Sequence, residues 1–124
     1  WAATRTPETI ERSLRKSINY GVYHGGQQVA FARVVTDEAV MFWLCDVVVL
    51  ESHRGQGLGK ALVEHVLGDP RLAGLVGILA TKDAHGLYER FGFVREGQRL
   101  MVKMPPTERG VPAHVTASPR PPAS

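Results

Sequence analysis

The first polar and apolar pattern in the chain is helical. The tripeptide Thr6-Pro7-Glu8 offers an N-cap threonine, a proline suited to the first helical position and an acidic residue for the first turn. Ile10 and Leu14 follow at a spacing of four residues, which places both on one helix face. The pattern predicts a helix that ends near Lys16 or Ser17.

Three extended segments come next, and each is rich in β-branched or aromatic residues. They span residues 19–23, 28–35 and 40–50, and His24-Gly25-Gly26-Gln27 supplies a hairpin loop between the first two. The third segment is the longest and is almost continuously apolar. Such a run is typical of a strand near the centre of a sheet, so residues 40–50 are predicted to lie there.

The pattern then alternates between helix and strand. Leu58, Leu62 and Val66 form a stripe on a predicted helix over residues 58–67, residues 75–80 read as a short buried strand, and a second helix is predicted from Ala84 to about Phe91. Residues 93–94 and 98–104 are predicted to pair as a final hairpin-like ribbon. A strand, a helix and another strand in this order indicate a mixed sheet with a βαβ crossover.

The composition changes at Pro105, which divides the chain in two. Six of the eight prolines lie in residues 105–124, with Ala, Ser and Thr between them. Such a segment cannot bury enough apolar surface to offset the entropy of ordering. We therefore predict one folded domain over residues 1–104 and a disordered tail over 105–124.

Composition and charge narrow the class of protein. The hydrophobic content is 44% and the charged content 22%, and no apolar run approaches the roughly 20 residues of a membrane-spanning helix. Cys45 is the single cysteine, so a disulfide framework is excluded and a cytoplasmic location is expected. The net charge of +3 is spread along the chain without aromatic interleaving, so neither a nucleic-acid nor a membrane partner is predicted.

A glycine-rich stretch at the junction of residues 40–50 and 58–67 is the strongest chemical signal. Its sequence is Arg54-Gly55-Gln56-Gly57-Leu58-Gly59-Lys60. Three alternate glycines, which lack a Cβ, next to the positive end of a helix favour binding of a pyrophosphate. Arg54 and Ala61 stand where a P-loop needs Gly and Ser or Thr, and Lys60 stands where a dinucleotide fingerprint needs its third glycine. For this stretch alone, a simple turn and helix start is an equal alternative.

A second segment completes a family pattern. The glycine stretch resembles the Gln/Arg-x-x-Gly-x-Gly/Ala loop of the GCN5-related N-acetyltransferase (GNAT) family, and residues 81–93 resemble its later motif Asn-x-x-Ala-x-x-Leu-Tyr-x-x-x-Gly-Phe. Thr81 departs from the motif at its Asn position. The matching residues are Ala84, Leu87, Tyr88, Gly92 and Phe93. The resemblance covers roughly residues 7–104.

The resemblance implies an α/β (α+β) fold: a mixed, mostly antiparallel central sheet with helices on both faces and an acyl-coenzyme A site. Acetyl-CoA is the implied acyl donor. The implied cofactor-binding residues are the backbone of a splayed central strand, the glycine loop and the start of the second motif: Val47, Val48, Val49, Arg54, Gly55, Gln56, Gly57, Leu58, Gly59, Lys60 and Thr81. Lys60 could equally be a solvated first-turn residue, and Arg54 a structural one.

The resemblance also suggests catalytic residues. Tyr88 matches the family tyrosine that protonates the departing thiolate, which is reasonable because phenol and thiol pKa values lie within about two units. Asp46 is a carboxylate in an apolar strand and is a candidate general base, although pairing with Arg33 is an equal alternative. His53 and His85 are further candidates for the base. No residue spacing suggests a metal ligand set.

These features predict an N-acetyltransferase that moves the acetyl group of acetyl-CoA to an amine of a small molecule or peptide by direct attack. The alternative is a non-catalytic acyl-CoA-binding module of the same fold. The family's usual first strand and helix have no counterpart ahead of Thr6, so the front is either missing or shortened. An exposed edge at residues 19–23 would then permit a homodimer.

Overall fold

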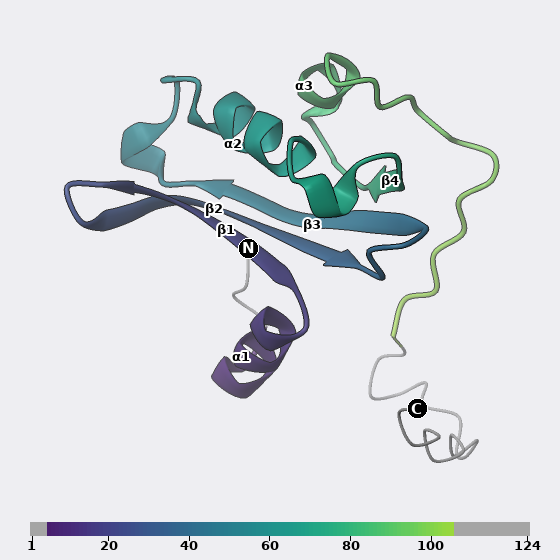
Figure 1. The fold of residues 1–124 in the computed structure, drawn as a ribbon, viewed down its shortest axis with the longest axis horizontal. Coiled ribbons are helices and arrows are strands. Elements are labelled where there is room, and N and C mark those ends of the chain that lie inside the picture. The colour runs from purple at the N-terminus through teal and green to yellow at the C-terminus, as the bar shows by residue number, and fades with distance from the viewer. Residues whose placement is uncertain (1–4, 106–124) are drawn as a thin grey trace.

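The computed structural model describes residues 5–105 (Figure 1). Its helices are α1 (Pro7–Arg15), α2 (Leu58–Leu67) and α3 (His85–Glu89), and its strands are β1 (Ile18–His24), β2 (Gln27–Thr36), β3 (Met41–Val49) and β4 (Val76–Leu79). Two short 3-10 turns, η1 (Glu51–His53) and η2 (Pro70–Leu72), flank α2. Each of these helices and strands was predicted from the sequence, with ends that differ by a few residues at most.

The four strands form one sheet in the order β1-β2-β3-β4. β1 pairs antiparallel with β2, β2 pairs antiparallel with β3, and β3 pairs parallel with β4. The helix α2 makes the crossover between the parallel strands. Figure 1 shows α1 on one face of the sheet and α2 and α3 on the other, which confirms the predicted mixed sheet with helices on both faces.

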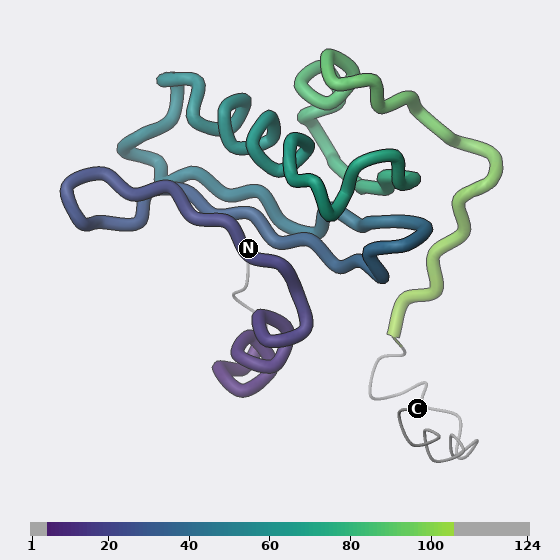
Figure 2. The backbone as a smooth tube through the Cα atoms, in the orientation of Figure 1, coloured from purple at the N-terminus to yellow at the C-terminus, as the bar shows by residue number. Residues whose placement is uncertain are grey.

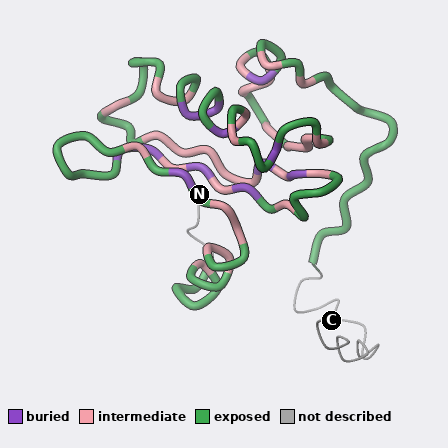
Figure 3. Tube along the Cα trace, viewed as in Figure 1, coloured by how far each residue is buried: buried purple, intermediate pink, exposed green. Residues whose placement is uncertain are grey.

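The core lies between the sheet and α2. Ala32, Val34 and Leu44 of the strands pack with Leu62 and Val63 of the helix, and all five are buried. Figure 3 shows this buried layer running along the inner strands and the facing side of α2. The apolar stripe of α2 therefore packs as its spacing predicts.

A β-bulge in β3 determines where β3 and β4 separate. Arg33 pairs with Asp46 and Val34 pairs with Leu44, so Cys45 is the extra residue of the bulge. Pairing of β3 with β4 stops at the same point: the last residue pair of these two strands is Leu44 with Leu79. A bulge bends its strand and increases the local twist. The second half of β3 therefore diverges from β4 and leaves one edge open.

The predicted final ribbon is wrong. Residues 92–105 contain no strand, and Figure 2 shows this stretch leaving α3 as a separate arm. A two-stranded ribbon without a third strand or a covering helix is marginally stable in water. The residue order Arg95-Glu96-Gly97 makes it weaker still, because charges and glycine disfavour pairing. The apolar side chains of the second half stay exposed: Leu100, Met101, Val102 and Met104.

Three further predictions concern the tail, the membrane and the edge of the sheet. The tail over 105–124 lies outside the described residues apart from Pro105. Within residues 5–105, no helix has the length and apolar character needed to cross a membrane. In the same range β1 has a strand on one side only, and the homodimer predicted through its other edge stays a prediction.

Candidate functional site

The open edge of β3 lies directly before the glycine loop. The Leu50 N–H donates to the Val29 carbonyl of β2 at 2.9 Å. Because successive residues of a strand direct their backbone groups to opposite edges, the N–H groups of Val49 and Val47 point away from β2. No described strand pairs with them there, since β4 ends opposite Leu44. The structure therefore supports the predicted backbone donors at Val47 and Val49.

Val48 does not share this geometry, and its predicted contact with the cofactor stays a prediction. It lies opposite Phe31 in the register of β2 and β3. By the same alternation its backbone groups point to β2 and are used in the sheet. Its side chain faces α1, where it lines a groove with Ile10 and Leu14.

The glycine loop has the conformation that an anion cradle requires. Gly55 has φ of 80° and Gly57 has φ of 78°, a left-handed backbone that disfavours other residues. A Cβ at either position would meet nothing within 4 Å, so the loop is open to solvent at both glycines. The Ala61 N–H donates to the Gly57 carbonyl at 3.0 Å, which begins α2 immediately after the loop.

The N-terminus of α2 lacks the caps that stabilise α1. In α1, Thr6 Oγ1 accepts a hydrogen bond from the Thr9 N–H at 3.2 Å, and Glu8 lies in the first turn. In α2, Gly57 has no side chain to accept such a bond, and the first turn contains no acidic residue. Lys60 adds a positive charge where the helix dipole is already positive. A bound anion would satisfy both the N–H groups and this charge.

Arg54 joins the glycine loop to the open edge of β3. Its Nε donates to the Val49 carbonyl at 3.2 Å, on the edge that β4 leaves open. Arg54 therefore has the structural role that the sequence left open, because its side chain binds the backbone of β3. The side chain is also exposed, so the rest of the guanidinium faces solvent beside the loop.

Tyr88 is the best-defined candidate for acid chemistry. It is buried in α3, and its ring lies edge-to-face with Phe93 at a centroid distance of 6.0 Å. Burial raises the pKa of Tyr88 above its ordinary value. The phenol therefore stays protonated through neutral pH and can donate its proton.

The structure places Asp46 in an ion pair. Arg33 Nε donates to Asp46 Oδ2 at 2.7 Å, and Arg33 Nη1 donates to Ser17 Oγ at 3.0 Å. Only 12% of the Arg33 side chain and 10% of the Asp46 side chain are exposed, so this pair is largely shielded from water. The pairing with Arg33 that the sequence left open is thus present, while a role for Asp46 as general base stays a prediction.

Thr81 lies between β4 and α3, where its side chain has a local partner. Its Oγ1 accepts a hydrogen bond from the Ala84 N–H at 3.0 Å, which satisfies a donor at the start of α3. Its predicted contact with the cofactor stays a prediction.

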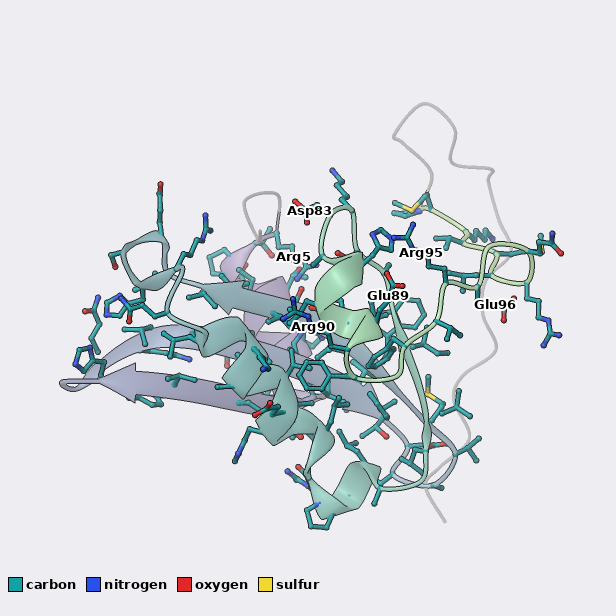
Figure 4. All side chains as sticks on the ribbon, turned by 90° about the horizontal axis from the view of Figure 1, so that it is seen from above. Arg5, Asp83, Glu89, Arg90, Arg95 and Glu96 are labelled. Atoms are coloured by element: carbon teal, nitrogen blue, oxygen red, sulfur yellow. The ribbon has the colours of Figure 1, made fainter. Side chains whose placement is uncertain are left out.

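Figure 4 shows the charged residues around α3, and among them Arg95 Nη2 pairs with Glu89 Oε1 at 3.4 Å.

One pairing near the glycine loop was not predicted from the sequence. His24 at the end of β1 and His53 in η1 approach within 3.5 Å between Nδ1 and Nε2, although they lie 29 residues apart. His53 was considered only as a candidate base. No spacing signal could have identified the pair, because it depends on how the β1–β2 hairpin and η1 meet.

Comparison with known proteins agrees with this geometry. A family model described as an acetyltransferase (GNAT) domain matches residues 15–95. A solved structure from Xanthomonas campestris pv. campestris, assigned to the GNAT family, is 42% identical and covers 90% of this chain and 80% of that chain, with a TM-score of 0.80.

Two curated relatives are named for their acceptors. The chain is 32% identical over 83 residues to the ribosomal protein bS18-alanine N-acetyltransferase of Escherichia coli, which is 61% of this chain and 54% of that protein. It is 36% identical over 101 residues to the chloroplastic serotonin N-acetyltransferase 2 of Oryza sativa, covering 73% of this chain and 50% of the relative. The chain thus spans about half the length of these relatives. With the family model matching well over half of its residues, the chain belongs to the GNAT acetyltransferase family.

Proposed function

We propose that this chain is an N-acetyltransferase that transfers the acetyl group of acetyl-CoA to an amine by direct attack. The observation that carries the proposal is the meeting of three features at one end of β3. These are the open edge after the bulge, the left-handed glycine loop and the uncapped start of α2. Family membership supports the same donor.

The three features divide the binding of the donor between them. The N–H groups at the start of α2 and the glycine loop would hold the pyrophosphate, and Lys60 would add charge beside it. The N–H groups of Val47 and Val49 would bind the amide-containing arm along the open edge. One of them would also polarise the thioester carbonyl, in the manner of an oxyanion hole.

The transfer itself needs a neutral amine and a proton for the leaving thiolate. The amine nitrogen attacks the thioester carbon, the C–N bond forms, the C–S bond breaks, and the nitrogen loses one proton. We propose that Tyr88, which its raised pKa keeps protonated at neutral pH, donates its phenolic proton to the leaving sulfur. Water takes up the proton that the nitrogen loses and returns one proton to the Tyr88 oxygen, so the protein is unchanged after each transfer. Proximity of the two bound reactants supplies a further part of the rate.

The acceptor class is an amine of a small molecule or a peptide. The two named relatives act on a protein alanine and on serotonin, so both are named for amine acceptors of different size. In this chain, a groove of about 350 Å³ lies between α1 and the strands, lined by Leu14, Phe31 and Val48 among other residues. We propose that it takes the apolar part of the acceptor, because Val48 belongs to the splayed half of β3.

The test is release of free thiol from acetyl-CoA in the presence of a panel of arylalkylamines, polyamines and short peptides with free N-termini. We expect thiol release that saturates with at least one amine and that requires the protein. Acetylated product is confirmed by mass spectrometry. If coenzyme A binds but no amine of the panel increases thiol release, the non-catalytic acyl-CoA-binding alternative replaces this proposal.

A further inference from the structure

Two histidines from separate elements face one another at the end of the sheet that carries the glycine loop. The β1–β2 turn and η1 lie at the same end of the sheet in Figure 1. The rings of His24 and His53 are nearly perpendicular at 84°, with Nδ1 of the first 3.5 Å from Nε2 of the second. This distance is long for a direct N–H···N hydrogen bond, whose usual length is about 2.9–3.0 Å.

The distance fits two ligands of one metal ion. Zinc binds imidazole nitrogen at about 2.0–2.1 Å, and a tetrahedral angle between two such bonds separates the nitrogens by roughly 3.3–3.4 Å. The two nitrogens here are 3.5 Å apart, so a small rotation of the exposed His24 ring would complete this arrangement.

Ser52 supplies the support that a metal-binding histidine requires. Its Oγ lies 2.8 Å from Nδ1 of His53. When the hydroxyl accepts the Nδ1–H, the lone pair of Nε2 is directed at His24. Metal-ligating histidines usually make such a bond with their second nitrogen, because it fixes the tautomer and the ring orientation.

We propose that His24 and His53 form a surface site for a divalent transition-metal ion of the zinc, nickel or copper(II) class. Imidazole nitrogen suits these ions. Within residues 5–105 no group of three or more His, Cys, Asp or Glu side chains is placed to hold a metal, so water completes the coordination. The bound ion would tie the β1–β2 turn to η1, immediately before Arg54 of the glycine loop.

The experiment is titration of the untagged full chain with zinc chloride, followed by isothermal calorimetry. One saturable site is expected. His24→Ala and His53→Ala should each lower the affinity at least tenfold, since each removes one of two ligands, and Ser52→Ala should lower it less. His65→Ala is the matched control, because His65 is an exposed histidine on α2, and it should bind zinc as the wild type does.

Circular dichroism melting checks that each variant is folded, which is expected because His24 is exposed and His53 is only half-buried. The site is rejected if the wild type shows no saturable zinc binding. It is also rejected if the folded His24→Ala and His53→Ala variants bind with wild-type affinity. Neither result depends on acetyl transfer, so the proposed enzymatic function would stand or fall separately.

Discussion

The hydroxyl of Tyr88 is held in an apolar setting that favours its neutral form. Its ring is buried against Phe93, and the helix that carries it ends at Glu89, three residues before Gly92, where φ is 89°. Desolvation raises the pKa of Tyr88, so the proton remains on the oxygen through neutral pH. This is the state that a donor to a thiolate needs.

Replacement of Tyr88 by Phe tests that role. We expect Tyr88→Phe to lower kcat by about 100-fold, within the range of general acid catalysis, and to leave the Kd for coenzyme A nearly unchanged. Thiol release measures kcat and calorimetry measures the Kd. Tyr23→Phe is the control, since Tyr23 is 67% exposed, and it should be silent. Full turnover in Tyr88→Phe would remove Tyr88 from the proton transfer.

The sequence predicted the position of Tyr88 but not the hydrogen-bond partner of Asp46. Tyr88 lies within a motif of fixed register, so its place on α3 followed from the sequence. Asp46 was predicted in an apolar strand, but its choice of partner was left open. The bulge at Cys45 sets Asp46 opposite Arg33, and bulges depend on cross-strand packing that one strand's sequence does not reveal.

The packing of β4 against β3 depends on Gly77, which leaves room for the ring of Phe42. Gly77 lies opposite Phe42 in the register, and a Cβ on Gly77 would lie 2.3 Å from Cζ of that buried ring. Such an approach cannot be accommodated without moving the ring or the strand. The absence of a side chain here is therefore a packing requirement of the element.

We expect Gly77→Ala to lower the free energy of unfolding by about 1–3 kcal/mol, the usual cost of overpacking a core. Urea denaturation monitored by circular dichroism measures this change. Gly86→Ala is the matched control, because a Cβ at that helical position meets nothing within 4 Å. It should be neutral or stabilising by up to roughly 1 kcal/mol. Equal stability of the two variants would contradict the contact.

A hydrogen-bonded carboxylate joins β1 to η2. Tyr20 Oη donates to Asp69 Oδ2 at 2.7 Å, and Arg71 Nη2 donates to the same oxygen at 2.7 Å. The Arg71 side chain first, and Tyr20 second, hold the pKa of Asp69 well below its ordinary value. Burial and the same carboxylate raise the pKa of Tyr20.

The lowered pKa of Asp69 makes the free energy of unfolding depend on pH. The contribution of Asp69 is present above the ordinary carboxyl pKa near 3.9 and is lost as the pH falls through the lower folded value. We expect wild-type stability to decline more than that of Asp69→Asn when urea denaturation is repeated at pH 7, 4 and 2.5. If the two proteins decline in parallel, the carboxylate does not couple folding to protonation.

The failed ribbon over residues 93–104 shows where local pattern stops being informative. The helix over residues 58–67 was predicted to the residue, because the glycine loop and Asp69-Pro70 mark its ends. The ribbon had apolar residues but no third strand to pair with in the described structure. Pairing of a strand is decided by its neighbours in space, which the local sequence does not specify.

At the scale of the whole molecule, the proposed donor site joins segments from β3, the glycine loop and α2. A ligand that binds this folded arrangement and not the unfolded chain must stabilise the protein by mass action. At a coenzyme A concentration of 100 times its Kd, the expected gain is about 2.7 kcal/mol. We therefore predict that coenzyme A raises the Tm by several degrees in differential scanning calorimetry.

A loop variant makes this prediction specific to the proposed site. Gly57→Val places a β-branched residue at a φ of 78°, which disrupts the loop, whereas Gly86→Ala changes a glycine of α3. The Tm of each variant without ligand serves as its own reference, so any intrinsic loss of stability is subtracted. Gly57→Val should lose most of the coenzyme A shift, and Gly86→Ala should keep it. An undiminished shift in Gly57→Val would place the pyrophosphate elsewhere, and no shift in the wild type would contradict coenzyme A binding itself.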